Sequence, residues 1–272
     1  MKISVIIPFH EINDKNYDLL KKAIKSIEKQ NDQDYPELFI VYPSEIEEEL
    51  LGKLVPEQSA IEDGITPIFI KNEGKTDYQS QVNLGVDNVN TEYFSVLEFD
   101  DEYSETYFMN AMEYVDNFPE IDILMTMMIE VNEKNEGIKL TNETVWAQQF
   151  VGENGEMGYL NVNALKQYTD FKLSGAVIKT SEFKNLGGYK SNIKMTFMYE
   201  FLLRALNNAS KIFTIPKIGY KHFATREGSL FDGYLKTMPI PERKFWFETA
   251  TKESNFINDR PIDTSKIMSI VK

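Results

Sequence analysis

The chain lacks cysteine altogether and has only two histidines among its 272 residues. Without cysteine it can form neither a disulfide nor a thiolate site, so the sequence gives no indication of redox compartment. With His10 and His222 as the whole supply of imidazole, a histidine-rich zinc site is disfavoured. The metal chemistry that remains open is that of oxygen ligands.

Long apolar runs are also missing. No stretch approaches the roughly 20 apolar residues that a membrane-spanning helix needs, so we expect no transmembrane segment. The opening MKISVIIPFH has one basic residue, but its apolar run ends at Pro8 and is too short for a signal peptide. These features predict a cytoplasmic protein.

Positive charge is scarce, since 29 Lys and Arg face 43 Asp and Glu for a formal net charge of −14. Such a field argues against nucleic acid or an anionic membrane as a partner. A phosphate-bearing substrate would need a metal ion or a local basic group to offset it. The apolar content of 42% supports a sizeable core, and the length fits one large α/β domain or two small ones.

The first hundred residues alternate short apolar runs with helical patterns. The predicted strands are 2–9, 38–42, 67–70 and 93–97. Between them we predict an amphipathic helix around 20–27, an acidic helix over 44–51, a loop over 52–64, and a helix over 78–89 with Asp77 as its N-cap. This β-α-β-α-β-α-β order is typical of a doubly wound, mostly parallel sheet.

The second half has a different character. It predicts helices over 104–118, 160–168, 197–206 and 242–254, strands over 121–131 and 173–179, one or two strands over 211–223, and an irregular polar stretch over 132–158. We therefore divide the chain into a nucleotide-binding half (1–101), an acceptor half (102–230) and a C-terminal helical extension (231–272). Trp246 is expected in the core, whereas Trp146 lies in the polar stretch and is a candidate for stacking on an acceptor sugar.

An acidic tip follows the fourth predicted strand, in the segment YFSVLEFDDE. It carries Glu98, Asp100 and Asp101. On an extended chain Glu98 and Asp100 would point to one side and Asp101 to the other. Carboxylates suit Mg²⁺ or Mn²⁺, although a solvated acidic turn explains the motif equally well.

The position of the acidic tip in the sheet favours a site. Ligands of doubly wound sheets bind beyond the carboxyl ends of the strands. Residues 8–11, 42–44 and 71–75 should gather at that same edge.

These motifs together resemble a family 2 glycosyltransferase of the GT-A fold. ISVIIPFHE is similar to that family's opening strand, and SQVNLGVDNVNTEYFSVLEFDD to its Asn-x-Gly helix (Asn83, Gly85) and metal-binding strand end. SGAVIKTSEFKNLGGYK, YEFLLRAL and HFATREGSL resemble its later strand, its helix with a terminal arginine and its closing loop. The order matches over about residues 3–230, and the C-terminal half is also similar to glycosyltransferase-like proteins of large tailed phages, whose site of action would be the host cytoplasm.

The resemblance implies that a sugar moves from a nucleotide-diphospho-sugar to the hydroxyl of an unknown glycan, lipid or protein acceptor, usually with inversion. A Mn²⁺ or Mg²⁺ ion would stabilise the departing nucleotide. It assigns the metal to Glu98, Asp100, Asp101 and His222. Donor contacts would come from Pro8, Phe9, His10, Glu11, Tyr42, Ser44, Lys75, Asn83 and Arg226, with Lys221 as a further basic group near the phosphates.

Two departures from the family pattern put parts of this reading in question. Where the family has an Asp that reads uracil or ribose, this chain has Tyr42-Pro43-Ser44; Tyr42 is a candidate to stack on the base and Ser44 to bond the ribose. Where the family has a Glu-Asp pair before its arginine helix, this chain has Phe197 and Met198. The nearest carboxylate is Glu200, the predicted base. Its alternative role is a surface ion pair with Arg204, four residues on.

The departures leave three functions open. The first is a metal-dependent glycosyltransferase. The second is a GT-A-like binding or structural protein that has lost catalysis. A nucleotidyltransferase is the third and weakest, because residues 10–16 do not supply the glycine-rich phosphate loop that such enzymes use.

Overall fold

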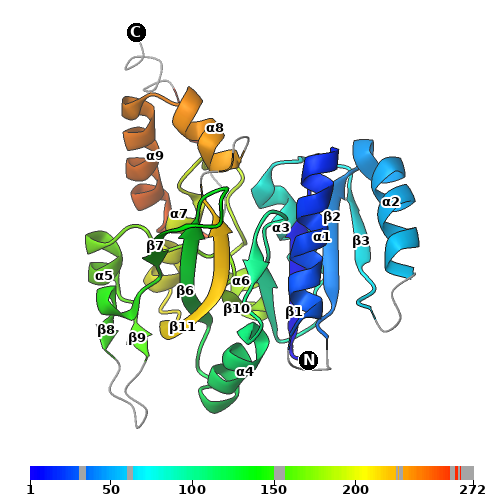
Figure 1. Ribbon diagram of the computed structural model, residues 1–272. Helices are drawn as coiled ribbons and strands as arrows, with labels where there is room; N and C mark the ends of the chain where they lie inside the picture. The colour runs from blue at the N-terminus through cyan, green and yellow to red at the C-terminus, as the bar shows by residue number, and fades with distance from the viewer. Residues whose placement is uncertain are drawn as a thin grey trace.

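The computed structural model describes residues 1–30, 35–59, 64–149, 157–224, 226, 229–257, 261–262 and 264. Within this part of the chain the strands form one mixed sheet of order β3-β2-β1-β4-β10-β6-β11-β9-β8, with β5 and β7 paired to β11 and β6. Helices cover both faces of the sheet (Figure 1). The β1–β3 half and the β6–β11 half lie side by side, joined through β4 and β10.

The first half has the predicted alternating order. Its elements are β1 (Ile3–Pro8), α1 (Asp14–Glu28), β2 (Leu38–Pro43), η1 (Ser44–Ile46), α2 (Glu47–Ser59), β3 (Ile68–Asn72), α3 (Tyr78–Asn88) and β4 (Tyr93–Val96). The neighbouring strands β3, β2, β1 and β4 are all parallel. Strands β1, β2 and β4 are buried along their whole length, which explains their continuous apolar sequences. The predicted Asp77 cap is confirmed, since its carboxylate accepts the backbone N–H of Ser80 at 2.9 Å.

The loop predicted over 52–64 is wrong in its first part, because α2 continues to Ser59. Gly52 and Pro56 are poor helix residues and suggested an earlier end. However, Leu50 and Leu54 lie one turn apart and are both fully buried against the first half of the sheet. Burial of this apolar face outweighs the local cost of glycine and proline.

The second half completes the sheet with strands of both directions. Its elements are β5 (Glu102–Tyr103), α4 (Tyr107–Asn117), β6 (Ile123–Val131), β7 (Gly137–Thr141), η2 (Thr144–Trp146), β8 (Gln148–Gln149), β9 (Gly158–Tyr159), α5 (Val162–Gln167), β10 (Val177–Lys179), α6 (Thr180–Asn185), α7 (Phe197–Asn207), β11 (Ile212–Phe223), α8 (Leu230–Thr237) and α9 (Ile240–Glu253). Strand β10 is antiparallel to both β4 and β6, and β11 is parallel to β6. The sheet is therefore mixed, and its first half is parallel.

Strand β7 was not predicted, because residues 132–158 were expected to be irregular. It pairs with β6 in an antiparallel hairpin. The Asn132 side chain closes the turn by accepting the backbone N–H groups of Lys134 and Glu136. Four of its five residues are exposed, so β7 lacks the buried alternation that marks a strand in sequence.

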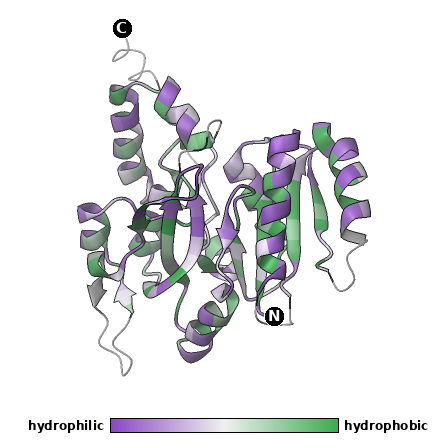
Figure 2. Ribbon diagram, viewed as in Figure 1, coloured by the Kyte–Doolittle hydropathy of each residue, from purple (hydrophilic) through white to green (hydrophobic). Residues whose placement is uncertain are grey.

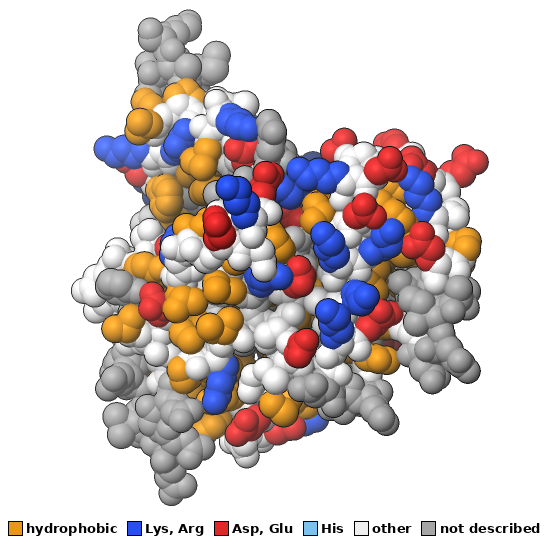
Figure 3. Space-filling view, viewed as in Figure 1, with side chains coloured by type: hydrophobic (Ala, Val, Ile, Leu, Met, Phe, Trp, Pro, Cys, Tyr) orange, Lys and Arg blue, Asp and Glu red, His pale blue; other side chains and the backbone are white. Residues whose placement is uncertain are grey.

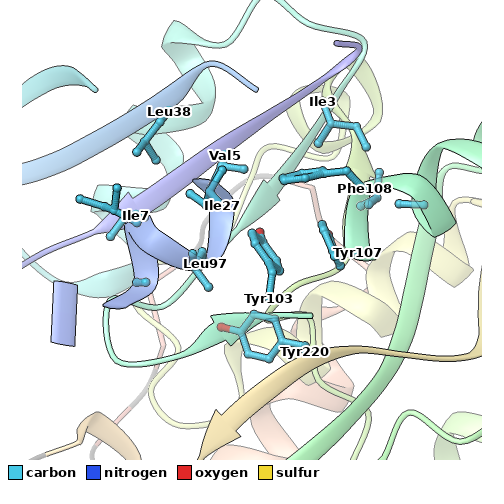
Figure 4. Packing of buried hydrophobic residues seen from close by; sticks show 14 of the residues in the cluster. Ile3, Val5, Ile7, Ile27, Leu38, Leu97, Tyr103, Tyr107, Phe108 and Tyr220 are labelled. Carbon is cyan, nitrogen blue, oxygen red and sulfur yellow. The ribbon is translucent and has the colours of Figure 1, made fainter. Parts of the chain in front are cut away.

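The core consists of two apolar layers, one on each face of the sheet. Alternate residues of β1 divide between them: Val5 packs on the side of α1 and α4, and Ile6 on the side of α3, α6 and α7. Apolar residues line the strands and the inner faces of the helices (Figure 2). Tyr103 stacks on Tyr107 at 4.0 Å and packs against Tyr220 at 5.7 Å, which ties β5 and α4 to β11 (Figure 4).

The C-terminal helices pack on the second half. Trp246 of α9 is 2% exposed, which confirms its predicted place in the core. Its carbonyl accepts the Thr196 hydroxyl at 2.9 Å, and Phe247 contacts Tyr199 of α7. The Trp146 side chain lies outside the described part of the structure, and the boundary at residue 230 stays a prediction.

The surface in Figure 3 differs between the two halves. Charged side chains of both signs are interspersed over the α1–α2 side, while apolar side chains gather over the β6–β11 side. Among the residues that the structure describes, no helix combines the length and apolarity needed to cross a bilayer.

Candidate functional site: an acidic turn at the carboxyl end of β4

The chain turns sharply after β4 instead of remaining extended. The backbone N–H of Asp101 bonds to the carbonyl of Glu98 at 3.0 Å. This turn overturns the expectation that Glu98 and Asp100 share one side. Instead Glu98, Asp101 and His222 each bring a ligand atom to within 4.8 Å of the others.

Pairing of β5 with β11 explains why His222 reaches this turn. Glu102 and Tyr103 pair with Lys221 and Tyr220, so the residue before β5 lies beside the residue after Lys221. The Asp101 carboxylate is fully buried; Oδ2 lies 2.8 Å from Nδ1 of His222, and Oδ1 accepts the backbone N–H of Phe223 at 2.9 Å. Asp101 therefore orients the imidazole toward the turn.

Glu98 is held by the chain that enters β10. Its carboxylate accepts the Ser174 hydroxyl, and its backbone N–H donates to the Tyr220 hydroxyl at 3.1 Å. Gly175 makes this approach possible: its φ is +68°, and a Cβ there would lie 2.2 Å from the Tyr220 ring. Only glycine adopts this conformation at low cost while leaving room for Tyr220.

Asp100 points to a different partner. Its carboxylate pairs with Nε of Arg226, and the guanidinium lies 5.1 Å from the centre of the Phe99 ring. Both residues are 7% exposed. The metal-binding role of Asp100 stays a prediction. Its contact with Arg226 places a cation beside the acidic turn, where a phosphate-bearing substrate would need one.

Burial and mutual repulsion perturb the titration of the cluster. Burial raises the pKa of Glu98 to about 7, and the charge of Asp101 adds to the rise. Burial also raises the pKa of Asp100. Burial lowers the pKa of His222, but the charge of Asp101 and the hydrogen bond to it outweigh that effect and raise the pKa to about 9. Three carboxylates gathered here favour a bound cation.

Two carboxylates and an imidazole fit the metal that the resemblance implies. Oxygen donors suit Mg²⁺ and Mn²⁺, and Mn²⁺ accepts a nitrogen ligand readily. The residues that would hold the ion are Glu98, Asp101 and His222. Ser174 and the Phe223 backbone, which already bond the two carboxylates, would fix their orientation.

Some of the predicted donor-binding residues lie at the carboxyl ends of β1 and β2. Pro8 and Phe9 are buried at the end of β1, and the rings of Phe9 and His10 contact Phe99 at 5.2 and 5.4 Å. This group, followed by the exposed Glu11, therefore adjoins the acidic turn. The exposed Ser44 follows β2 directly and begins η1.

Two predicted donor contacts, Tyr42 and Lys75, and the further basic group Lys221 contact other side chains of the protein. The Tyr42 ring is 2% exposed and packs against Phe69, so stacking on a base would require it to leave this contact. Lys75 is exposed, with Nζ 3.5 Å from the Ser191 hydroxyl. Lys221 pairs with Glu102 at 2.9 Å.

Asn83 has a clear structural contact. Its side-chain amide donates to the Tyr189 carbonyl and accepts the Tyr189 backbone N–H, both at 2.8 Å. A Cβ on Gly188 would lie 2.6 Å from the Asn83 oxygen, and Gly188 has a φ of +68°. Asn83 thus holds the Gly187-Gly188 turn against α3, and a donor contact from it stays a prediction.

Glu200, the predicted base, lies at the centre of a buried ion-pair network. It is fully buried; Oε1 lies 2.9 Å from Nε of Arg204 and 3.0 Å from Nζ of Lys190, and Oε2 accepts from Arg204 at 2.9 Å. The predicted i, i+4 pair with Arg204 therefore exists, but its expected position on the surface is wrong. The catalytic role of Glu200 stays a prediction.

Sequence reasoning missed three side chains near the turn: Ser174, Tyr220 and Tyr78. The small Ser174-Gly175 pair was a usable signal, because it marks a close approach of two backbones. Tyr78 and Tyr220 gave none, since a tyrosine in an apolar pattern indicates core.

The chain has a GT-A-like fold, as the comparison with known structures shows. S. aureus TarS residues 1–349 in complex with UDP-GlcNAc has a TM-score of 0.68 and 18% identity, covering 98% of this chain and 69% of that one. The complex with UDP has a TM-score of 0.64 and 15% identity, covering 94% and 81%. Full-length TarS has a TM-score of 0.61 and 17% identity, covering 98% and 41%. No family model and no curated protein matches the chain.

Proposed function

We propose that this protein is a glycosyltransferase that takes a sugar from a nucleotide-diphospho-sugar and transfers it, with inversion, to an acceptor hydroxyl. The observation that carries the proposal is the Glu98–Asp101–His222 cluster at the carboxyl end of a parallel strand in a GT-A fold. Two of the similar TarS structures are complexes with UDP-GlcNAc and with UDP, which supports uridine nucleotides as the first donors to test.

Each group at the turn has a part in this reaction. A divalent ion supplies charge stabilisation to the departing diphosphate when it is bound. Glu98, Asp101 and His222 would hold that ion. Arg226, fixed by Asp100 and Phe99, presents a cation to the phosphates at a site whose other charges repel them.

A second candidate is a GT-A-like binding protein without catalysis. It is favoured by the start of α7, where Phe197 is buried against Tyr78 and Tyr189. Neither Phe197 nor Met198 can accept a proton, and Glu200 is enclosed by Lys190 and Arg204. This candidate predicts that a nucleotide-sugar binds and remains intact.

Thermal unfolding with ligands tests the donor site that both candidates share. We expect UDP or a UDP-sugar to raise the melting temperature only when Mn²⁺ is present, because the phosphates need a cation. A ligand that binds only the folded state at a hundredfold excess over its Kd adds about 2.7 kcal/mol of stability. GDP- and dTDP-sugars serve as comparison donors. If no nucleotide shifts the melting temperature with Mn²⁺, the proposed donor site is contradicted.

A further inference from the structure

Tyr78 has a buried hydroxyl that bonds to nothing in the described part of the chain. It is the first residue of α3, and its neighbours fix its place. Asp77 caps the helix, the Gln79 amide donates to the carbonyl of Ile193 at 2.8 Å, and the Tyr78 ring contacts Phe197 at 5.4 Å. The Tyr78 ring therefore packs where the start of α3 meets the start of α7.

Tyr78 begins the helix that follows β3, at the carboxyl edge of the parallel strands where β4 also ends in the acidic turn. Burial raises its pKa well above the usual value, and the charges of Glu98, Asp101 and Asp100 raise it further. A neutral phenol can donate or accept a hydrogen bond, but toward an anionic oxygen, which has no proton to give, it acts as the donor. The three carboxylates already accept hydrogen bonds from Ser174, His222, Phe223 and Arg226.

An unpaired hydroxyl at this place calls for an explanation. A buried donor without an acceptor carries a desolvation penalty, and a phenylalanine of the same shape would avoid it. The penalty disappears if a ligand oxygen occupies the space between Tyr78 and the turn. A phosphate oxygen has the required charge, but the carboxylates would repel it unless a cation came with it.

We propose that the Tyr78 hydroxyl donates a hydrogen bond to a phosphate oxygen of the donor bound at the Glu98–Asp101–His222 cluster. The inference rests on the proposed function and adds a binding residue to it. Because the phosphate arrives with the ion, Tyr78 contributes to binding of the metal–nucleotide complex and not to binding of the metal alone.

Tyr78→Phe tests this assignment by calorimetric titration with Mn²⁺ alone and with UDP in the presence of Mn²⁺. We expect UDP to bind about tenfold more weakly, which corresponds to about 1.4 kcal/mol, and Mn²⁺ alone to bind as it does to the wild type. The melting temperature of the unliganded variant should be no lower than that of the wild type, because the change removes an unpaired polar atom.

Tyr93→Phe is a matched control. The Tyr93 hydroxyl is also buried without a partner and also lies near carboxylates, those of Glu92, Asp122 and Asp116. However, Tyr93 begins β4, at the opposite end of that strand from Glu98. This variant should bind UDP with Mn²⁺ as the wild type does.

Three outcomes separate the inference from the proposed function. Equal UDP binding by Tyr78→Phe and the wild type overturns the inference alone. Weaker binding of Mn²⁺ alone by Tyr78→Phe also overturns it, because the hydroxyl would then act on the metal and not on the phosphate. A wild type that binds no UDP with Mn²⁺ contradicts the proposed function and the inference with it.

Discussion

Asp101→Asn is expected to abolish the binding of Mn²⁺ while leaving the fold intact. Asp101 supplies one of the three candidate ligand atoms and also bonds Nδ1 of His222, so the change removes a ligand and the support of another. Loss of an outer partner alone typically costs 10–100-fold in metal affinity. We expect the combined loss to exceed about 100-fold in a titration with Mn²⁺.

The fold should survive this change for two reasons. The asparagine oxygen can still accept the backbone N–H of Phe223, as Oδ1 of Asp101 does at 2.9 Å. Removing one of three neighbouring carboxylates also relieves their repulsion.

Asp122→Asn is the control for Asp101→Asn, because Asp122 likewise accepts a backbone N–H, that of Lys211, and pairs with a cation, Lys179, away from the turn. Unchanged Mn²⁺ affinity in Asp101→Asn, or an equal loss in Asp122→Asn, would show that the metal does not bind at the turn.

Glu200→Gln is expected to destabilise the protein strongly. The change leaves Arg204 and Lys190, which are 0% and 2% exposed, without their counter-charge. Breaking a buried ion pair in this way typically costs about 3–5 kcal/mol. For a chain of this size that corresponds to a fall in melting temperature of about 6–20 °C.

The damage should reach two neighbouring segments. Arg204 also donates to the carbonyls of Leu186 and Gly188, which form the glycine turn, and Lys190 donates to the carbonyl of Glu253 at the end of α9. Through Arg204 and Lys190, Glu200 therefore links the glycine turn to α7 and α9.

Glu49→Gln provides the comparison, since Glu49 pairs with Lys53 at the same i, i+4 spacing and 2.8 Å but on an exposed helix face. We expect its melting temperature to stay almost unchanged. If Glu200→Gln keeps its melting temperature and loses only sugar transfer, the network reading is wrong and the predicted role of Glu200 as base is supported.

The strands and helices of the first half follow closely from the sequence. Periodicity is a direct consequence of burial, so β1, β2 and β4, which are buried on both faces, and α1, which has one buried face, are visible as patterns. Where burial leaves no pattern, prediction fails, as it does for the exposed strand β7. The end of α2 was misjudged for the opposite reason, because packing of Leu50 and Leu54 overrides residue preference.

The sequence nominates residues for the candidate site, and their role stays a prediction, but it does not give their arrangement in space. A strand that ends in carboxylates locates Glu98 and Asp101, and the resemblance adds His222. Asp101 contacts His222, whereas Asp100 contacts Arg226. This difference depends on the Glu98–Asp101 turn and on the pairing of β5 with β11. Both arise from contacts far apart in the chain, which no local pattern encodes.

The sequence also did not predict which ion pairs are buried. The spacing of Glu200 and Arg204 is identical to that of Glu49 and Lys53, although one pair is fully buried and the other exposed. Sequence spacing fixes which side chains meet on a helix, but the elements packed around them decide what the contact is worth.

Release of nucleotide from a nucleotide-sugar measures the central proposal most directly. The wild type is incubated with Mn²⁺ and the donor that stabilises the fold most, and free nucleotide is followed over time, with Asp101→Asn and a chelator as controls. We predict release that requires both Mn²⁺ and Asp101, slow with water alone as the acceptor. A donor that binds at saturation and remains intact, including with glycan, lipid and protein acceptors, would contradict sugar transfer and identify the protein as a GT-A-fold binding protein.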